Sequence, residues 1–358
     1  PTLESYELFA RSIGADTDIV EKEMFIVPDK KGQNLVLRPE ATASVVRAYI
    51  DGLLDKGPTK LFYLGPMFRY ERPQKGRYRQ FWQIGAEAIG YPGPGIDAEL
   101  ILLLDLYFKE LGLKNSEKGI RNSGLGIGGS RIPNSEFRNQ IQLKLNNLGC
   151  KKCRPAYREA LVSYLRNNQA GLCEDCKRRI GLNPLRVLDC KKESCKEITK
   201  KAPCPSGFLC NDCLTHFDRL KNILDQQKIS FQVDDQLVRG LDYYTRTVFE
   251  FQAQTGLGSQ NAVVGGGRYD DLVEELGGPP LPAIGFALGV ERLVILLEQK
   301  ISDDEILSGP EVFLVFAGED AYQFAFKLVF SLRQAGLYAE MAIDEPSRSL
   351  RSQLKWAD

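Results

Sequence analysis

The feature that most constrains the fold is a pair of strand-like stretches joined by a short basic segment. Alternating apolar residues predict strands at Lys60–Leu64 and Gln80–Ile89. The span between them, Phe68–Arg79, is basic and holds Pro73 and Gly76, which is typical of a turn. The sequence therefore predicts an antiparallel hairpin with a positively charged tip.

Helix and strand patterns divide the chain into four sections. Residues 1–145 mix both patterns: a strand at Leu35–Leu37 precedes a helix whose apolar residues recur with the 3.6-residue period. Residues 146–235 are mainly helical and interrupt strand patterns that resume in 236–305, so we expect an inserted domain. After a polar link, residues 309–358 read as strand, helix and strand, the beginning of an α/β unit.

Length and composition narrow the class of protein. A chain of 358 residues exceeds one typical domain, and its 47 lysines and arginines equal its 47 acidic residues, so any RNA must be held by local basic patches. Membrane spans need roughly 18 consecutive apolar residues, and no such run occurs. With no signal peptide recognisable, we expect a soluble, cytoplasmic protein; because it begins at Pro1, we also expect a missing N-terminus.

The densest chemical signal lies on the predicted hairpin, in the segment Gly65-Pro66-Met67-Phe68-Arg69-Tyr70-Glu71-Arg72-Pro73-Gln74-Lys75-Gly76-Arg77-Tyr78-Arg79-Gln80-Phe81. Triphosphates favour arginine, whose guanidinium binds oxygens in pairs, and adenine needs a stacking ring and an acceptor for its amine. The segment supplies all of these. The alternative is a solvated hairpin whose charges serve only solubility.

This segment resembles motif 2 of the class II aminoacyl-tRNA synthetases, in the version found in histidyl enzymes. The resemblance continues in order along nearly the whole chain. Pro1 and the following helix resemble the end of motif 1, and Gly285–Leu293 resembles motif 3. Between them, Leu237–Tyr244 and Gly266–Asp270 resemble the two histidine-specific signatures. The resemblance implies an α+β fold: an antiparallel-sheet catalytic core, a helical insertion and a partial α/β anticodon-binding domain.

The resemblance also implies an ATP site and a catalytic role for two arginines. Arg69 would grip the α-phosphate, with Arg239 reaching it from the opposite side and stabilising the charge that builds on phosphorus. Further ATP-binding residues would be Glu71 at the adenine amine, Phe81 stacked on the ring, Arg77, and Arg292 at the γ-phosphate. ATP would bring Mg²⁺, and no general base is required because a carboxylate is already a nucleophile.

A histidine pocket follows from the same resemblance. Glu40, Thr42 and Gln83 match the residues that receive the α-ammonium group. Glu87 and Tyr244 match the pair that brackets the imidazole, with Tyr243 lining the wall and Arg239 beside the substrate. Hydrogen bonds to both ring nitrogens would discriminate by roughly 10⁴ without an editing site. Alternatively, the two adjacent tyrosines are ordinary strand aromatics.

Several smaller expectations complete this part. Gly265–Gly267 sit within a strand pattern and should form the floor of the pocket. Ala41 replaces a glycine usual in the family, and Trp82 should point away from the pocket by strand alternation. Gly124–Gly129 satisfies G-x-G-x-x-G, but mostly polar residues precede it, so we interpret it as a loop and not a dinucleotide site.

All nine cysteines fall within residues 150–213. In a cytosolic protein, C-x-x-C pairs favour metal over disulfides. Three pairs have this spacing, and we expect Cys173, Cys176, Cys210 and Cys213 to hold a structural zinc ion. The alternative is a set of reduced thiols that pack a small helical domain. The family resemblance implies that this insertion contacts the acceptor arm of the RNA, and its basic residues permit such a contact.

The implied activity is ATP-dependent activation of L-histidine and its transfer to histidine tRNA, by a homodimer without membrane association. One alternative is a non-catalytic paralogue that serves as a regulatory subunit in histidine biosynthesis. Such relatives typically lose the ATP-gripping arginines, whereas Arg69, Arg239 and Arg292 all stand here. Another is an RNA-binding or signalling module on the same fold, which the complete pocket disfavours.

Overall fold

The computed structural model describes residues 1–15, 17–54, 57–114, 140–258, 261–298, 309–342 and 349–357. Residues 1–300 form one compact unit and residues 301–358 a second. The loop predicted at Gly124–Gly129 lies outside the described residues, as does most of the polar link before residue 309. Among the described helices, none is long and apolar enough to cross a bilayer.

A small sheet and two helices begin the first unit. Strands β1 (Leu3–Ser5), β3 (Asn34–Leu37) and β2 (Phe25–Pro28) pair antiparallel in that order. Helix α1 (Tyr6–Ile13) starts at Ser5, whose hydroxyl accepts the Glu7 N–H at 3.2 Å and so caps the helix. The strand expected at Leu35–Leu37 is confirmed, and helix α2 (Thr42–Ile50) follows it.

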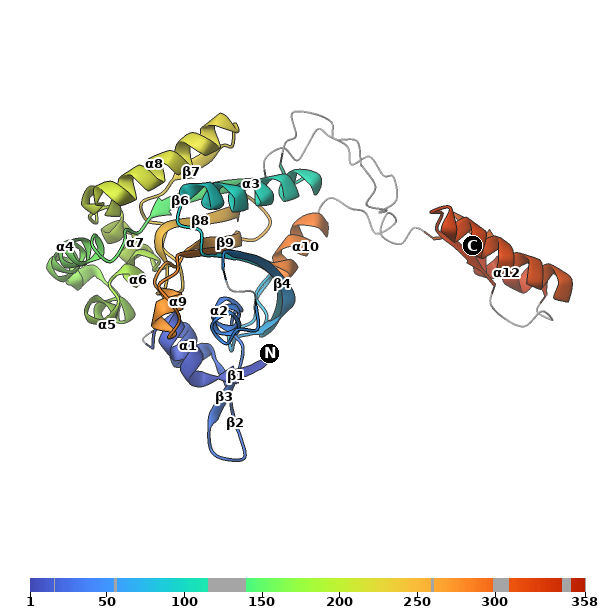
Figure 1. The fold of residues 1–358 in the computed structure, drawn as a ribbon, viewed down its shortest axis with the longest axis horizontal. Coiled ribbons are helices and arrows are strands. Elements are labelled where there is room, and N and C mark those ends of the chain that lie inside the picture. Colours follow the sequence, from blue (N-terminus) through green and yellow to red (C-terminus); the bar gives the residue numbers. More distant parts are fainter. Residues whose placement is uncertain are drawn as a thin grey trace. The chain divides into compact units, whose positions relative to one another are not determined.

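A seven-stranded sheet forms the centre of the unit (Figure 1). Its strands, in spatial order, are β4 (Thr59–Phe68), β5 (Gln80–Ile89), β10 (Ala283–Gly289), β9 (Ala262–Arg268), β8 (Thr245–Ala253), β6 (Ile141–Asn147) and β7 (Phe231–Val233). All neighbours are antiparallel except β6 and β7. The α+β class expected from the sequence is confirmed.

The predicted hairpin is β4 and β5, and its first strand is longer than predicted. It continues through Gly65 and Pro66 to Phe68, where the sequence indicated an end at Leu64. Because β4 lies at the edge of the sheet, Pro66 costs no internal hydrogen bond, and its carbonyl accepts the Nε–H of Arg38 at 2.9 Å. The segment beyond Phe68 forms the tip, as expected.

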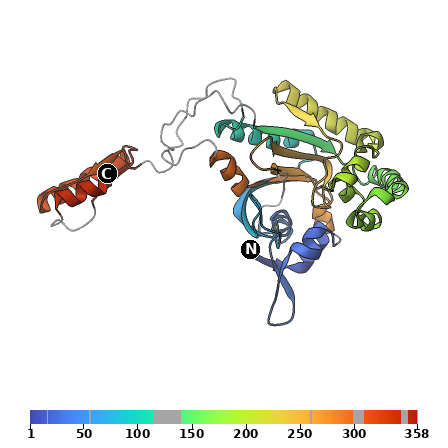
Figure 2. The ribbon, with the colours of Figure 1, turned by 180° about the vertical axis from the view of Figure 1, so that it is seen from behind.

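Helices cover the sheet and carry its core. The helices α3 (Pro94–Glu110) and α8 (Asn211–Gln226) pack together beside strands β6 and β8, as both views show (Figures 1 and 2). A continuous apolar cluster joins these two helices to the sheet, and it includes Leu104, Leu220 and Phe249, all nearly inaccessible to solvent. The shorter helices α9 (Leu272–Glu275) and α10 (Val290–Glu298) follow strands β9 and β10.

The inserted helices lie between β6 and β7 in the chain. Before α8, they are α4 (Arg154–Asn167), α5 (Glu174–Leu182), α6 (Leu185–Leu188) and α7 (Glu193–Thr199), with short 3-10 turns at Gln169–Gly171 and Pro205–Phe208. The four helices gather on one side of the first unit (Figure 2). The range expected for the insertion, 146–235, overlaps the sheet at both ends, since β6 runs to Asn147 and β7 is Phe231–Val233.

The second unit has the expected strand, helix and strand. Strands β11 (Val312–Leu314) and β12 (Ala339–Met341) pair parallel, joined by helix α12 (Glu319–Gln334), and α13 (Leu350–Ala357) follows. One detail differs from the expected helix face: Val329 is buried, but Phe324 is 66% exposed. The buried stripe of α12 contains the smaller Ala325 instead of Phe324.

Candidate active site

One cavity of about 740 Å³ opens over the large sheet and is lined by both halves of the core and by the insertion. It brings together eleven of the twelve residues predicted for ATP and histidine: Glu40, Thr42, Arg69, Glu71, Arg77, Phe81, Gln83, Arg239, Tyr243, Tyr244 and Arg292. The twelfth, Glu87, lies just below the surface of the cavity, where it bonds to Thr42 and Tyr269, which do line it. Residues more than 200 positions apart thus share one site.

The acidic end of the cavity is built on the first turn of α2. The buried carboxylate of Glu40 accepts the backbone N–H groups of Thr42 at 2.7 Å and Ala43 at 2.9 Å. It takes the place of a side-chain cap, because Ala41 at the N-cap has none to offer. Burial raises the pKa of Glu40, while these two N–H groups act to lower it. Glu40 is therefore fixed in position by the helix that follows it.

Glu87, on β5, lies at the base of this end. Its carboxyl group accepts the hydroxyls of Thr42 at 2.7 Å and Tyr269 at 2.5 Å. Burial raises the pKa of Glu87 to about 8, and the nearby charge of Glu40 adds to the rise, against the lowering by both hydroxyls. A cationic group placed here would favour the ionised form of Glu87 and be held by it.

Glycines on β9 and β10 allow these side chains to lie flat on the sheet. A Cβ on Gly265 would overlap the guanidinium of Arg239, and a Cβ on Gly285 would overlap the carboxylate of Glu87. A Cβ on Gly267 would lie 2.9 Å from the Tyr244 ring, and one on Gly266 would overlap Phe249. Of the three glycines expected to form the floor, Gly265 lines the cavity and Gly266 and Gly267 do not, whereas Gly285, which was not predicted, lines it as well.

The other end of the cavity is basic. The guanidinium of Arg69 lies 5.3 Å from the Phe81 ring centroid, and its Nε–H donates to the Pro39 carbonyl at 2.9 Å. Glu71 is ion-paired with Arg77 and lies 4.0 Å from Arg69. The hairpin tip thus presents a cation, an aromatic face and a carboxylate together, the three groups that a nucleotide base and its phosphates require.

Arg292 reaches the same space from α10. Its Nε–H donates to the Gly76 carbonyl at 3.0 Å, and Nη1 donates to that of Ala262 at 2.5 Å, so the start of α10 is tied to the hairpin tip. Burial and, to a smaller extent, the charges of Arg77, Arg69 and Arg239 together lower the pKa of Arg292 to about 10. These four guanidinium groups repel one another, and an anion bound among them would relieve this repulsion.

Arg239 stands between the two ends and is paired with a residue that the sequence did not indicate. Burial acts to lower the pKa of Arg239, but its ion pair with Glu250 and the adjacent Tyr244 outweigh burial and raise it. Its guanidinium carbon lies 5.9 Å from the Tyr244 ring centroid. The ion pair with Glu250 holds the Arg239 guanidinium in one orientation, as hydrogen-bonded neighbours of catalytic groups do in other enzymes.

Three further side chains escaped the prediction. Tyr63 on β4 and Tyr269 after β9 line the cavity beside Glu250 of β8. Because side chains alternate between the two faces of a strand, Tyr63 of β4 lies on the face opposite the exposed Phe62 and Leu64. This alternation could have identified Tyr63 from the sequence. Trp82 points away from the cavity, as predicted: its side chain is 43% exposed and does not line the cavity, and its backbone N–H donates to the Glu291 carboxylate at 2.8 Å. Ala41 is buried near the start of α2.

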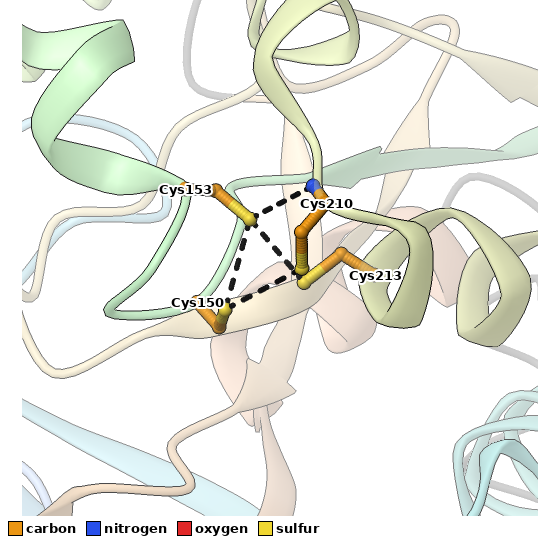
Figure 3. A group of neighbouring side chains, drawn as sticks. All are labelled: Cys150, Cys153, Cys210 and Cys213. Carbon is orange, nitrogen blue, oxygen red and sulfur yellow. Dashed lines mark hydrogen bonds between the residues drawn. The ribbon is translucent and has the colours of Figure 1, made fainter.

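The cysteines form two groups, and neither is the combination expected. Cys150 and Cys153 meet Cys210 and Cys213 (Figure 3), whereas Cys173 and Cys176 meet Cys190 and Cys195. The expected set of Cys173, Cys176, Cys210 and Cys213 is therefore wrong. Cys210 and Cys213 belong to a different group from Cys173 and Cys176, because the start of α4 brings Cys150 and Cys153 beside α8. Spacing along the chain does not encode this long-range contact. All nine thiols are free of disulfides.

Comparison with known proteins agrees with this geometry. A family profile described as histidyl-tRNA synthetase matches residues 1–124 and 164–293. The chain belongs to the histidyl-tRNA synthetase family. It is 49% identical to the histidine–tRNA ligase of Desulfosudis oleivorans, aligned over the whole chain and 78% of that protein. It is also 49% identical to the ligase of Thermodesulfovibrio yellowstonii, over the whole chain and 79% of that protein.

Solved structures give the same result for the fold. The apo histidyl-tRNA synthetase of S. aureus superposes with a TM-score of 0.70 at 34% identity, covering the whole chain and 78% of that protein. A Bacillus halodurans protein described as an ATP phosphoribosyltransferase regulatory subunit/histidyl-tRNA synthetase has a TM-score of 0.60 at 22% identity, covering 99% of the chain and 86% of that protein. This second likeness concerns the fold alone. The family resemblance inferred from the motifs, and with it the class of aminoacyl-tRNA ligase, is confirmed.

Proposed function

We propose that this chain activates L-histidine with ATP to histidyl-adenylate and transfers the histidyl group to the 3′ end of histidine tRNA. The observation that carries the proposal is the convergence of Arg69, Arg239 and Arg292 on one cavity that also holds the buried carboxyl group of Glu40, with that of Glu87 just beneath its surface. Guanidinium groups suit a triphosphate, and carboxyl groups suit a cationic amino acid.

The cavity favours attack of a carboxylate on the α-phosphate. Arg69 and Arg239, which line the cavity, would neutralise negative charge as it develops on phosphorus, and Arg292 would hold the leaving pyrophosphate. Bound with ATP, Mg²⁺ would supply further counter-charge to the phosphates. The carboxylate needs no base, so positioning and charge stabilisation account for the rate.

Unpartnered atoms in the cavity support an amino acid as the substrate. Among the described residues, Oε1 of Gln83 and Nε of Arg239 are buried without a hydrogen-bond partner. The α-ammonium of the substrate could donate to Gln83 and Glu40, and its carboxylate could accept from Arg239. Glu87 and Tyr244 would bracket the imidazole, with Tyr243 on the wall. A smaller or apolar side chain would lack the hydrogen bonds that an imidazole can make with these groups.

The partners and location of the enzyme belong to the same proposal. Phe62 is 83% exposed and Leu64 61% exposed on edge strand β4, an apolar surface suited to a second copy of the chain in a homodimer. The second unit would bind the anticodon, and the basic insertion the acceptor arm. We propose a cytoplasmic location, since the established relatives are tRNA ligases.

A structural metal ion completes the proposal. The two cysteine groups offer only sulfur ligands, four in each. Sulfur disfavours Mg²⁺ and Ca²⁺, which take oxygen ligands, and suits Zn²⁺. No catalytic step is assigned to this ion, because the cysteines would fill all four tetrahedral positions.

Histidine-dependent exchange of pyrophosphate into ATP tests the catalytic proposal. The folded, dimeric chain should show exchange that requires L-histidine. If it binds histidine without exchange, it is a binding protein of the kind that regulates histidine biosynthesis. Charging of histidine tRNA, measured separately, tests the second step.

A further inference from the structure

We infer that the insertion holds two separate zinc ions with different tasks, an inference that rests on the zinc part of the proposed function. The first site is Cys150, Cys153, Cys210 and Cys213, and it joins the two ends of the insertion to the large sheet. The second site is Cys173, Cys176, Cys190 and Cys195, and it holds a wall of the active-site cavity.

The geometry of the first site matches a tetrathiolate. Zinc–sulfur bonds of about 2.3 Å place tetrahedral sulfur atoms about 3.8 Å apart. The Sγ atoms of Cys150 and Cys153 lie 3.6 Å apart, those of Cys150 and Cys210 3.9 Å, and those of Cys153 and Cys213 3.7 Å (Figure 3). A disulfide would require about 2.05 Å. The four sulfur atoms therefore surround a space of the size of one ion.

Backbone groups around the first site complete it. The N–H of Cys210 donates to Sγ of Cys153 at 3.1 Å, a bond that stabilises a thiolate. Gly149 adopts φ +74°, and a Cβ there would lie 2.8 Å from that of Cys153, so only glycine permits this turn. A side-chain amide links the site to the core: Nδ2 of Asn147, the last residue of β6, donates to the Cys213 carbonyl at 3.0 Å.

The position of the first site explains its task. Cys150 and Cys153 lie where the chain leaves β6, and Cys210 and Cys213 lie where it enters α8, which packs on α3 of the core. An ion here closes the 60-residue loop that contains the other inserted helices. Such a cross-link restricts the unfolded chain and fixes both ends of the insertion.

The second site has the same chemistry in a different place. Its four sulfur atoms also lie within 4.8 Å of one another, with Cys173 and Cys190 at 4.0 Å, and the N–H of Cys173 donates to Sγ of Cys195 at 3.3 Å. The buried members, Cys176 and Cys195, come from α5 and α7. Two short helices of nine and seven residues are thereby held together.

The second site lies at the wall of the active-site cavity. Cys173 and Cys190 line it, together with Lys191, Lys192 and Lys196 from the same segment. The ion pairs of these lysines are exposed and contribute little to order: Lys191 with Asp189 and Lys196 with Glu193. An ion bound by Cys190 and Cys195 would fix this lysine-bearing segment where phosphate oxygens of a substrate can reach it.

Metal content tests the inference without any substitution. The purified chain should contain two zinc ions, and titration of the metal-free chain with Co²⁺ should reach the tetrathiolate absorption at two equivalents. Saturation at one equivalent overturns the two-site inference but leaves structural zinc standing. Absence of bound metal overturns both, and histidine-dependent exchange decides the catalytic proposal independently of either.

Paired substitutions test which four cysteines bind each zinc ion. Cys150→Ser with Cys210→Ser, and Cys173→Ser with Cys190→Ser, each replace two half-buried thiols of one site and should each leave one ion. The matched control is Cys204→Ser, an exposed cysteine in neither group, which should keep two. A double variant that retains two ions, or loses both, overturns the assignment to independent sites.

Limited trypsin digestion tests the task of the second site. The variant at Cys173 and Cys190 should be cut after Lys191, Lys192 or Lys196 at least about tenfold faster than the unsubstituted chain, because loss of the ion frees the segment. The variant at Cys150 and Cys210 should be cut there at the parental rate. Equal rates in both variants overturn the assignment of the second ion to the cavity wall.

Discussion

The hydroxyl of Tyr269 lies 2.5 Å from Oε2 of Glu87, and this contact joins the end of β9 to the middle of β5 at the base of the cavity. Thr42 donates to the other carboxyl oxygen of Glu87 at 2.7 Å. Two hydroxyls therefore fix a buried carboxyl group whose pKa is raised to about 8 by burial. Several measurable properties depend on this arrangement.

Replacing Glu87 with Gln should flatten the pH dependence of stability. Because the pKa is raised in the fold, the protonated carboxyl stabilises the folded state, fully below its unfolded pKa of about 4.3 and progressively less as pH rises through about 8. The unsubstituted chain should lose up to about 1.4 kcal/mol per pH unit within this window relative to Glu87→Gln. Unfolding by urea from pH 5 to 9 measures the difference; parallel curves would contradict it.

Gly285→Ala should weaken histidine binding, because the added methyl group would overlap the Glu87 carboxylate and meet the Ala86 carbonyl at 2.8 Å. Displacing one charged hydrogen-bond partner costs about 1.5–3 kcal/mol, so we expect a dissociation constant at least about tenfold higher by calorimetry. The matched control is Gly181→Ala on α5, where a methyl group meets open space. Unchanged histidine affinity in Gly285→Ala would show that Glu87 does not contribute to histidine binding.

The sequence predicted the core of this site well, because the motifs name individual positions. Arg69, Arg239 and Arg292 share the cavity although they lie up to 223 positions apart in the chain. Their partners were not foreseen. Glu250, on β8, pairs with Arg239 in the loop that precedes this strand, and nothing local to Glu250 distinguishes it from an ordinary strand residue.

The cysteines show the same limit more clearly. Spacing identified three C-x-x-C pairs, but which pairs meet depends on the packing of α4 beside the start of α8. Cys190 and Cys195, separated by four residues, have no knuckle spacing and were therefore left out. Strand β4 was predicted too short because Gly65 and Pro66 resemble a turn, whereas a sheet edge tolerates both.

Removing the Arg239 charge should lower catalysis far more than histidine binding. Because replacing Arg239 alone would leave Glu250 buried and unpaired, the variant is Arg239→Met with Glu250→Gln. Loss of one group that stabilises the transition state should lower histidine-dependent pyrophosphate exchange by about 10²–10³-fold, whereas loss of its hydrogen bond to the substrate carboxylate should weaken histidine binding only about tenfold. Equal losses of exchange and affinity would contradict the catalytic role.

A matched pair of charges controls for that experiment. Arg178 and Glu21 form an exposed ion pair at 2.9 Å, outside the residues that line the cavity. Arg178→Met with Glu21→Gln removes the same two charges and should leave exchange within about twofold of the parent, since exposed pairs contribute at most about 1 kcal/mol. A large loss in this control would attribute the effect to net charge instead of position.

Asp97 supports the pocket from behind, and Asp97→Asn should destabilise the first unit. Asp97 and Arg268 are both fully buried and lie 2.6 Å apart, and Nε2 of His216 on α8 lies 2.9 Å from the same carboxylate. Losing the charge of Asp97 leaves Arg268 buried with a weaker partner, at a cost of about 3–5 kcal/mol in the free energy of unfolding. Asp218→Asn, in an exposed pair with Lys221 on α8, should cost less than about 0.5 kcal/mol.

The pH dependence of this effect has a definite sign. Burial acts to raise the pKa of Asp97, but His216 and Arg268 outweigh it and lower the pKa below its usual value. Its stabilising contribution is therefore present above the unfolded pKa of about 3.9 and is lost as pH falls through the lower folded value. The difference in the free energy of unfolding between the parent and Asp97→Asn should therefore narrow in acid.

Asp97→Asn should also affect the substrate pocket. Because Arg268 precedes Tyr269, the partner of Glu87, the variant should raise the KM for histidine more than it lowers kcat. A variant with parental stability and an unchanged KM would show that Asp97 supports neither the fold nor the pocket.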